Sequence, residues 1–194
     1  MNYLAHVFLA ENNDESIIGN FLGDFVKGRL TDQYNPEILK GIITHRKIDA
    51  YTDSHVRVKN CRRLISEDRR RWSGVIIDIL FDYFLSLRWD DYSNEDLDDF
   101  IAHVYDILLR NEAILPENSK QRIISLVTNN WFSKYRTIEG LSKVFEGLSK
   151  RVRVKNTLNG AEKELVNNFD ELSENFDEFF PQLIDYVDEV RIFI

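Results

Sequence analysis

Apolar residues recur three and four positions apart along nearly the whole chain, and this spacing most narrows the folds that the chain can adopt. The segments Leu4–Phe8 and Ile17–Phe25 show it at once, and it is the spacing of one face of a helix. No stretch alternates apolar and polar residues for long enough to predict a strand. Glycine and proline are also scarce, with 8 and 3 residues among 194. We therefore predict an all-α, single-domain helical bundle over residues 1–194, with about eight to ten helices.

Local signals predict several helix ends. Asn35-Pro36-Glu37 predicts a helix start with Asn35 as the N-cap, and this helix should reach about Tyr51. Asp53 or Ser54 should cap a basic helix, which Ser73-Gly74 should end. The later predicted segments are Val75–Trp89, Ser93–Leu108 with Ser93 and Asp96 at its start, Pro116–Val127, Thr137–Leu148, and a last helix from Leu165 that Pro181 should kink or restart.

Composition excludes several classes of protein. The net charge of −8 argues against general nucleic-acid binding, and no apolar run is long enough to cross a bilayer. The N-terminus lacks the basic segment and uninterrupted apolar segment of a signal peptide. Cys61 is the single cysteine, so an internal disulfide is impossible and a reducing compartment is indicated. We expect a cytoplasmic protein without membrane insertion.

The charge is distributed unevenly along the chain. Residues 1–75 hold 12 Lys and Arg against 10 Asp and Glu, whereas residues 76–194 hold 13 against 23. Within the first part, residues 57–71 form a basic stretch. Most such runs are solvated helix faces, but this one could also be a landing surface for an acidic partner.

The densest group of chemically capable side chains lies in residues 41–55. His45 and Asp49 are four apart, so they project from one face of the predicted helix, and Asp53 continues that line. An imidazole and a carboxylate on one face form half of a site for Mn²⁺, Fe²⁺, Zn²⁺ or Mg²⁺. A His–Asp hydrogen bond that only buttresses the helix explains the spacing at least as well.

Asp78 and Asp82 are also four apart, in an apolar segment that should be buried. Two like charges on one buried face are unfavourable unless a positive group lies between them. Arg46 or Arg136 could supply that charge. A metal could supply it as well, or one Asp could bind the metal while the other orients a ligating His.

Further polar residues with this spacing lie on apolar helices. The two pairs are Asn2 with His6 and Asn20 with Asp24. Gly19 and Gly23 lie beside the second pair, and a glycine inside a helix costs about 1 kcal/mol relative to alanine. Close helix packing or a tight site around Asp24 would explain them. Because polar groups from four helices converge in the predicted core, a metal or cofactor site is favoured over four separate buttresses.

The motifs, taken together, resemble those of the acyl carrier protein phosphodiesterases, also called acyl-carrier-protein hydrolases. They are Asn2-Tyr-Leu-Ala-His6, Gly19-Asn-Phe-Leu-Gly-Asp24-Phe-Val-Lys27-Gly28, Gly41-Ile-Ile-Thr-His45-Arg46-Lys-Ile-Asp49-Ala-Tyr-Thr-Asp53-Ser-His55 and Asp78-Ile-Leu-Phe-Asp82-Tyr-Phe-Leu85 with Trp89. The resemblance covers nearly the whole chain and is densest in residues 1–90. One departure is Tyr83, where some members have a histidine.

The resemblance implies a fold of the His/Asp metal-dependent phosphohydrolase type. It implies hydrolysis of the phosphodiester that joins 4′-phosphopantetheine to serine in holo-acyl carrier protein, a partner from fatty acid biosynthesis. The implied cofactor is a divalent metal, typically Mn²⁺, with Mg²⁺ or Fe²⁺ as alternatives. The acidic carrier protein would suit the basic stretch of residues 57–71.

The resemblance also suggests roles for individual residues. The expected metal ligands are Asp24, His45, Asp49 and Asp82, with His6 as a further ligand or base and Asp78 behind them. The expected catalytic group is Asp24, His45, Arg46, Asp49 and His6. The expected substrate contacts are Lys27 and Arg46 for phosphate oxygens and Arg62, Arg63 and Arg70 for the carrier protein.

Two other functions are compatible with the same residues. The first is a metal-dependent phosphohydrolase of nucleotides or other small phosphodiesters, which needs no docking surface for a protein. The second is a non-catalytic helical module that binds carrier protein and needs no metal.

Overall fold

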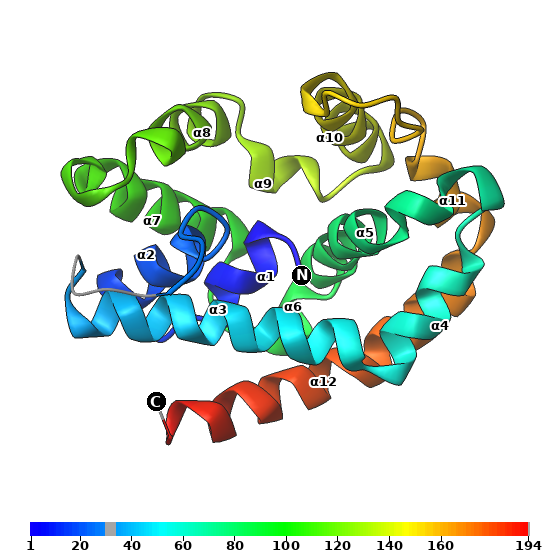
Figure 1. Ribbon diagram of the computed structural model, residues 1–194. Coiled ribbons are helices and arrows are strands. Elements are labelled where there is room, and N and C mark those ends of the chain that lie inside the picture. Colours follow the sequence, from blue (N-terminus) through cyan, green and yellow to red (C-terminus); the bar gives the residue numbers. More distant parts are fainter. Residues whose placement is uncertain (30–33, 194) are drawn as a thin grey trace.

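The computed structural model describes residues 1–29 and 34–193, apart from the side chain of Asn118, and within them it contains helices and no strand (Figure 1). The α-helices are α1 (Tyr3–Phe8), α2 (Asp14–Leu22), α3 (Pro36–Ser54), α4 (Val56–Leu64), α5 (Ser73–Leu87), α6 (Trp89–Tyr92), α7 (Leu97–Arg110), α8 (Glu117–Thr128), α9 (Trp131–Lys134), α10 (Ile138–Arg151), α11 (Glu162–Asn167) and α12 (Phe169–Arg191), and the short 3₁₀ helices are η1 (Glu67–Trp72) and η2 (Glu112–Ile114). The predicted all-α class is confirmed. The described helices outnumber the prediction because several have only four to six residues.

Side-chain caps begin the helices where the sequence predicted them in two cases. The Asn35 side chain accepts a hydrogen bond from the amide of Ile38 at 2.8 Å, and Pro36 is the first residue of α3. Asp96 caps α7 in the same way. Ser93 does not start this helix, because it ends α6 instead.

The predicted cap of α4 is wrong. His55, rather than Asp53 or Ser54, accepts the hydrogen bond from the amide of Arg57. The reason is that the other two side chains have partners elsewhere: Asp53 pairs with Arg62 at 2.5 Å, and the Ser54 hydroxyl donates to a backbone carbonyl one turn earlier.

The predicted break at Ser73-Gly74 is wrong, and the last helix does not restart at Pro181. The basic helix ends before Ile65, and Ser73-Gly74 forms the first turn of α5 instead of a break. Pro181 lies inside α12, which continues through it as one helix. Because Pro181 is exposed, its ring meets solvent, and the lost amide hydrogen bond is confined to one position of a 23-residue helix.

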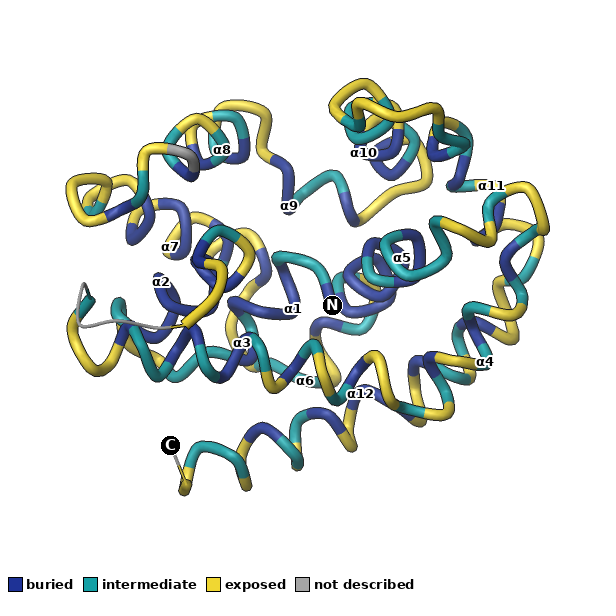
Figure 2. The backbone as a smooth tube through the Cα atoms, viewed as in Figure 1, coloured by how far each residue is buried: buried dark blue, intermediate teal, exposed yellow. Residues whose placement is uncertain are grey.

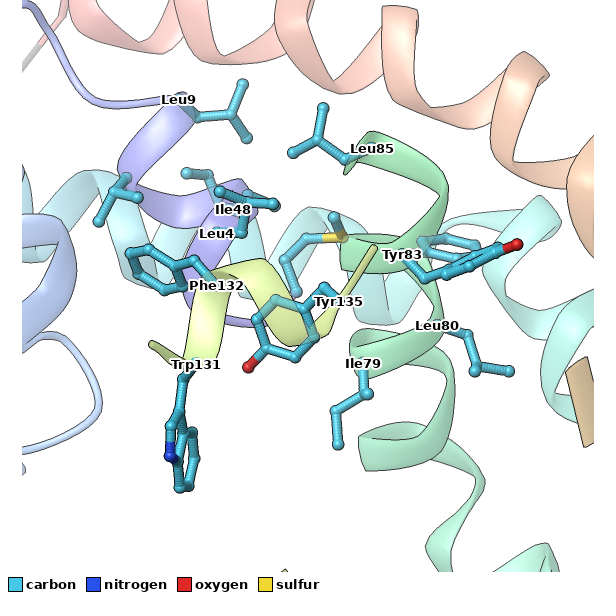
Figure 3. Packing of buried hydrophobic residues seen from close by; sticks show 14 of the residues in the cluster. Leu4, Leu9, Ile48, Ile79, Leu80, Tyr83, Leu85, Trp131, Phe132 and Tyr135 are labelled. Carbon is cyan, nitrogen blue, oxygen red and sulfur yellow. The ribbon is translucent and has the colours of Figure 1, made fainter. Parts of the chain in front are cut away.

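One hydrophobic core joins the helices, and their inward faces are the buried ones (Figure 2). The α3 helix packs against α2 on one side and α12 on another, while α1 lies between α2 and α5. Leu4 of α1, Ile48 of α3, Leu85 of α5 and Phe132 of α9 meet in this core (Figure 3). Within the described residues, no helix has both the length and the apolarity required to cross a membrane.

Candidate metal centre and its cleft

Three predicted site residues meet at the junction of α1 and α3. The Nε2 atom of His6 lies 3.1 Å from Oδ1 of Asp49, and Nε2 of His45 lies 3.2 Å from the other oxygen of the same carboxylate. The two imidazole rings stack with centroids 3.7 Å apart and planes inclined by 16°. One potential ligand atom from each residue therefore lies within 4.8 Å of the other two, and the group could hold a metal ion.

Glycines allow the helices to come close enough for this arrangement. Gly19 of α2 faces Gly41 of α3, and a Cβ on Gly19 would lie only 2.7 Å from the Gly41 Cα. A Cβ on Gly23 would overlap the imidazole of His45. The two explanations offered for the paired glycines are therefore both correct: Gly19 permits close helix packing, and Gly23 leaves room for a site side chain.

A backbone hydrogen bond fixes the orientation of His45. Its Nδ1 donates to the carbonyl oxygen of Asn20, 2.7 Å away. The side chain of Asn20 has a different role, since its amide donates to the carbonyl of Ser16. With Nδ1 occupied, Nε2 is the nitrogen that faces the carboxylates, and this is the arrangement that orients a ligating histidine.

Burial and charge act in opposite directions on the two histidines. Burial lowers the pKa of His45, but hydrogen bonds and charges from Asp24 and Asp49 outweigh it and raise the pKa to about 9. Burial and the neighbouring His45 charge lower the pKa of His6 to about 4, against the opposing effect of Asp49. Burial would raise the pKa of Asp49, but the two histidines hold it below its ordinary value. The site thus favours an ionised Asp49 with a positive charge beside it.

Asp24 lies at the edge of the cluster, where the chain leaves α2. Its Oδ1 is 3.7 Å from Nε2 of His45, and its side chain is 49% exposed. It falls in the turn after α2 rather than on the helix. The cluster opens there into a cavity of about 240 Å³, which Lys27 and Arg46 also line. Arg46 is held at this wall by donating to the carbonyl of Val26 at 2.9 Å.

Asp82 is part of the fold's interior and not of this cluster. It is fully buried, and its two oxygens accept the amide hydrogens of Leu4 and Ala5 at 2.9 and 3.1 Å. It thereby caps the start of α1, the helix that carries His6. Burial raises the pKa of Asp82 to about 7, although these two amides oppose the shift. Its predicted metal ligation has no support from these contacts.

The positive group beside Asp78 is the α-ammonium of Met1. This nitrogen lies 3.2 Å from Asp78 and 3.3 Å from Asp49. Burial opposes its charge, but the two carboxylates outweigh that effect and raise the pKa of the amine to about 10. The candidates taken from the sequence were wrong, because Arg46 bonds to Val26 and Arg136 pairs with Asp98 at 2.6 Å.

The remaining predicted residues lie outside the cluster. Arg62 pairs with Asp53, Arg63 donates to Asn60, and Arg70 donates to the carbonyl of Ile65. Tyr83 packs against the ring of Phe84, so the departure from the family motif does not reach His6, His45 or Asp49. Burial raises the pKa of the Cys61 thiol to about 12 and outweighs the lowering by Arg57, so this thiol is unreactive.

The donor atoms of the cluster fit a divalent cation. Two imidazole nitrogens and a carboxylate oxygen are a set that Mn²⁺, Fe²⁺ and Zn²⁺ accept. Of the two ring nitrogens of His45, only Nε2 is free to bind an ion, and it already points at Asp49. Ligand atoms about 2.1 Å from one ion lie about 3 Å apart in octahedral geometry, which is close to the two separations observed here.

The structure also contains contacts that sequence reasoning missed. Asn2 donates to the hydroxyl of Tyr135 at 2.7 Å, which ties α1 to the segment after α9. Burial and the charge of Asp24 raise the pKa of Tyr3 to about 12, so its hydroxyl stays protonated beside the cleft. Asn2 and Tyr135 are more than a hundred residues apart, and Asp24 lies in a turn. The i, i+4 spacing of a helix therefore carries no signal for either contact.

The fold and the cluster define an all-α protein with a His/His/Asp site that could hold a metal ion. The sequence profile of the family described as acyl carrier protein phosphodiesterase matches residues 1–183, and the chain belongs to this family.

Curated relatives extend the match over full lengths. An acyl carrier protein phosphodiesterase of Yersinia enterocolitica is 32% identical over 99% of this chain and 100% of its own length. Those of Yersinia pestis and Klebsiella pneumoniae are 33% and 32% identical, each over 95% of this chain and 96% of theirs. No solved structure matches the chain.

Proposed function

We propose that this protein hydrolyses the phosphodiester between 4′-phosphopantetheine and a serine of holo-acyl carrier protein. Water adds to phosphorus, the bond from phosphorus to the serine oxygen breaks, and the products are apo-carrier protein and free 4′-phosphopantetheine. The observation that carries the proposal is one cleft, lined by His45 and Asp49 of the cluster and by the cations Lys27 and Arg46, with His6 buried behind it, in a chain of this family. The cytoplasm is the compartment we expect.

The cluster is the part of the chain that would hold a cofactor. A divalent cation bound by His6, His45 and Asp49, for which we propose Mn²⁺, would polarise the phosphoryl group and lower the pKa of a bound water. Asp24 lines the open cleft with a side chain that is 49% exposed. Burial would raise its pKa, but the hydrogen bond and charge of His45 lower it. Asp24 is therefore ionised at neutral pH and can orient the attacking water by accepting its hydrogen.

The cations at the cleft wall suit the charge of a phosphodiester. Arg46 commits one nitrogen to the Val26 carbonyl, which leaves its remaining N–H groups to bind phosphate oxygens. Lys27, three residues after Asp24, is exposed and adds a point charge. Both residues would also stabilise the additional negative charge of the transition state.

The test is a reaction of metal-stripped protein with holo-acyl carrier protein, with and without Mn²⁺, read by intact mass spectrometry. We expect the carrier protein to lose the mass of 4′-phosphopantetheine only when Mn²⁺ is present. No loss with any divalent metal would reject the proposal. Turnover of bis(4-nitrophenyl) phosphate without any action on the carrier protein would instead favour the small-phosphodiester enzyme, and binding without metal dependence would favour the non-catalytic module.

A further inference from the structure

The segment from α8 to α10 is strongly basic, although the chain as a whole is acidic. Residues 117–151 contain seven Lys and Arg but only three Glu and no Asp. The large negative charge of residues 76–194 conceals this segment when the charge is averaged over that part of the chain. In the fold, α8, α9 and α10 lie together on the side of α1 opposite to α3 and α12 (Figure 1).

Two arginines of this segment lie beside the indole of Trp131. The guanidinium carbon of Arg151 is 4.5 Å from the ring centroid, and that of Arg122 is 5.8 Å from it. The indole of Trp131 is buried at the edge of the core and points away from the ring of Phe132 (Figure 3). Among the described side chains, no carboxylate lies within 4 Å of either guanidinium. These neighbouring positive charges therefore have no internal counter-ion in the described part of the chain.

The same cations line a path that begins at the candidate metal centre. Asp24 belongs both to the cavity at the cluster and to a second cavity of about 160 Å³, whose lining includes Tyr3, Arg122 and Arg151. The two arginines also line an adjoining cavity of about 280 Å³. A further cavity of about 180 Å³ shares Trp131 with the second one and is lined by Lys134 and Lys143.

Like charges are held close together along this path. Burial and the charge of Arg122 lower the pKa of Arg151, and burial and the charge of Lys143 lower the pKa of Lys134. Repulsion of this kind is relieved when an anionic partner binds. Arginine and tryptophan are also the residue types most enriched where partner proteins gain their binding energy.

The basic stretch of residues 57–71 differs in this respect. Arg57 pairs with Glu178, Arg62 with Asp53, and Arg69 with the buried Glu164. These three arginines join the chain's own helices, so part of the charge of the stretch is neutralised within the fold. These contacts give the stretch a structural role.

We infer that Arg122, Lys134, Lys143 and Arg151 around Trp131, here called the α8–α10 basic surface, form the docking site for the acidic face of the carrier protein. This inference rests on the proposed function, because it places the phosphodiester of the docked partner at the nearby His/Asp cluster. A protein face fits better than a single small anion, since the four cations are spread over three adjoining cavities instead of converging on one point.

Zero-length cross-linking tests where the partner docks without requiring turnover. The variant Asp49→Asn is incubated with holo-acyl carrier protein and a carbodiimide, which couples carboxylates to lysine amines, and the products are mapped by peptide mass spectrometry. We expect cross-links to Lys134 and Lys143 and none to Lys59 in the 57–71 stretch. Cross-links to Lys59 in place of these two, or no cross-links at all, would overturn the inference.

Charge reversal tests whether the surface contributes to catalysis on the protein substrate. The double variant Arg122→Glu, Arg151→Glu should raise KM for holo-carrier protein about tenfold and leave kcat within about twofold. Its turnover of bis(4-nitrophenyl) phosphate should be unchanged, which also shows that the site is folded. The matched control is Lys163→Glu, an exposed position on α11 outside all of these cavities.

The outcomes separate this inference from the proposed function. An unchanged KM for carrier protein, or an equal loss of activity on both substrates, would reject the docking site while hydrolysis of holo-carrier protein stands. Cross-links at Lys134 and Lys143 in a protein that never releases phosphopantetheine would reject the proposed function while the docking site stands.

Discussion

Two carboxylates, Asp49 of α3 and Asp82 of α5, share one sequence pattern and have opposite surroundings. Asp49 of α3 directs its oxygens at His6 and His45 and borders an open cavity. Asp82 of α5 gives both oxygens to backbone amides at the start of α1 and is closed off from solvent. The first presents its oxygens where an external cation can reach them, while the second holds both oxygens against the backbone in the interior. What distinguishes a candidate ligand from a structural carboxylate is therefore the set of partners that tertiary packing brings to it.

The largest effect should come from Asp49→Asn. This change keeps the size of the side chain but removes its charge, so the metal affinity and turnover of holo-carrier protein should fall by about 10³-fold or more. Metal affinity is measured by calorimetry with Mn²⁺ and turnover by intact mass. The matched control is Asp53→Asn, one turn further along α3 and 67% exposed, which should be nearly silent. An Asp49→Asn protein with a tenth of the normal activity would break the comparison.

Asp82→Ala should mainly affect stability. It leaves the buried amides of Leu4 and Ala5 without acceptors, and we expect the free energy of unfolding to fall by about 3 kcal/mol. Urea unfolding followed by circular dichroism measures this, and Asp82→Asn, which keeps one acceptor oxygen, should lose less. The folded fraction should still bind Mn²⁺. Unchanged stability combined with lost metal binding would instead make Asp82 a ligand.

Substitutions at two glycines distinguish damage to the site from damage to helix packing. In Gly23→Ala the new methyl group would displace the imidazole of His45, so turnover should fall by about 10²-fold with a modest loss of stability. In Gly19→Ala the methyl group would meet the backbone of α3 instead, so the loss of stability should be the larger effect, about 2 kcal/mol. Thermal unfolding and kcat of the two variants are compared; the reverse ranking would contradict the assignment.

The smallest effect concerns the pH dependence of stability. The folded pKa of Asp82 is about 7 and its ordinary value is 3.8, so the folded state binds more protons than the unfolded state between these values. Stability from this group is present below 3.8 and is lost as the pH rises towards 7. The difference in unfolding free energy between wild type and Asp82→Asn, measured by urea at several pH values, should narrow over this range. A gap that widens would show that Asp82 is ionised throughout.

The sequence predicted the parts of this account that depend on local spacing. The helical class, the Asn35 cap and the shared face of His45 and Asp49 all follow from contacts within one or two turns. The group beside Asp78 could not be predicted from local spacing, because it is the ammonium of Met1, which is distant from Asp78 in the sequence. The same limit applied to the arginines beside Trp131, which come from α8 and α10.

Charge patterns in the sequence showed which segments are basic, but not where unpaired positive charges lie in the fold. The 57–71 stretch was conspicuous because its arginines are adjacent in sequence, whereas pairing with Glu164 and Glu178 depends on helices about a hundred residues away. The cations of the α8–α10 basic surface are dispersed over 30 positions and interrupted by apolar residues. Only the folded chain places them along one path from Asp24.

The most direct test of the central claim is the position of the metal in crystals of the Mn²⁺-loaded protein, located by anomalous scattering at the manganese edge. We expect a single strong peak within bonding distance of Nε2 of His45, Nε2 of His6 and the carboxylate of Asp49. A peak between Asp78 and Asp82, or no peak at the three-residue cluster, would contradict it.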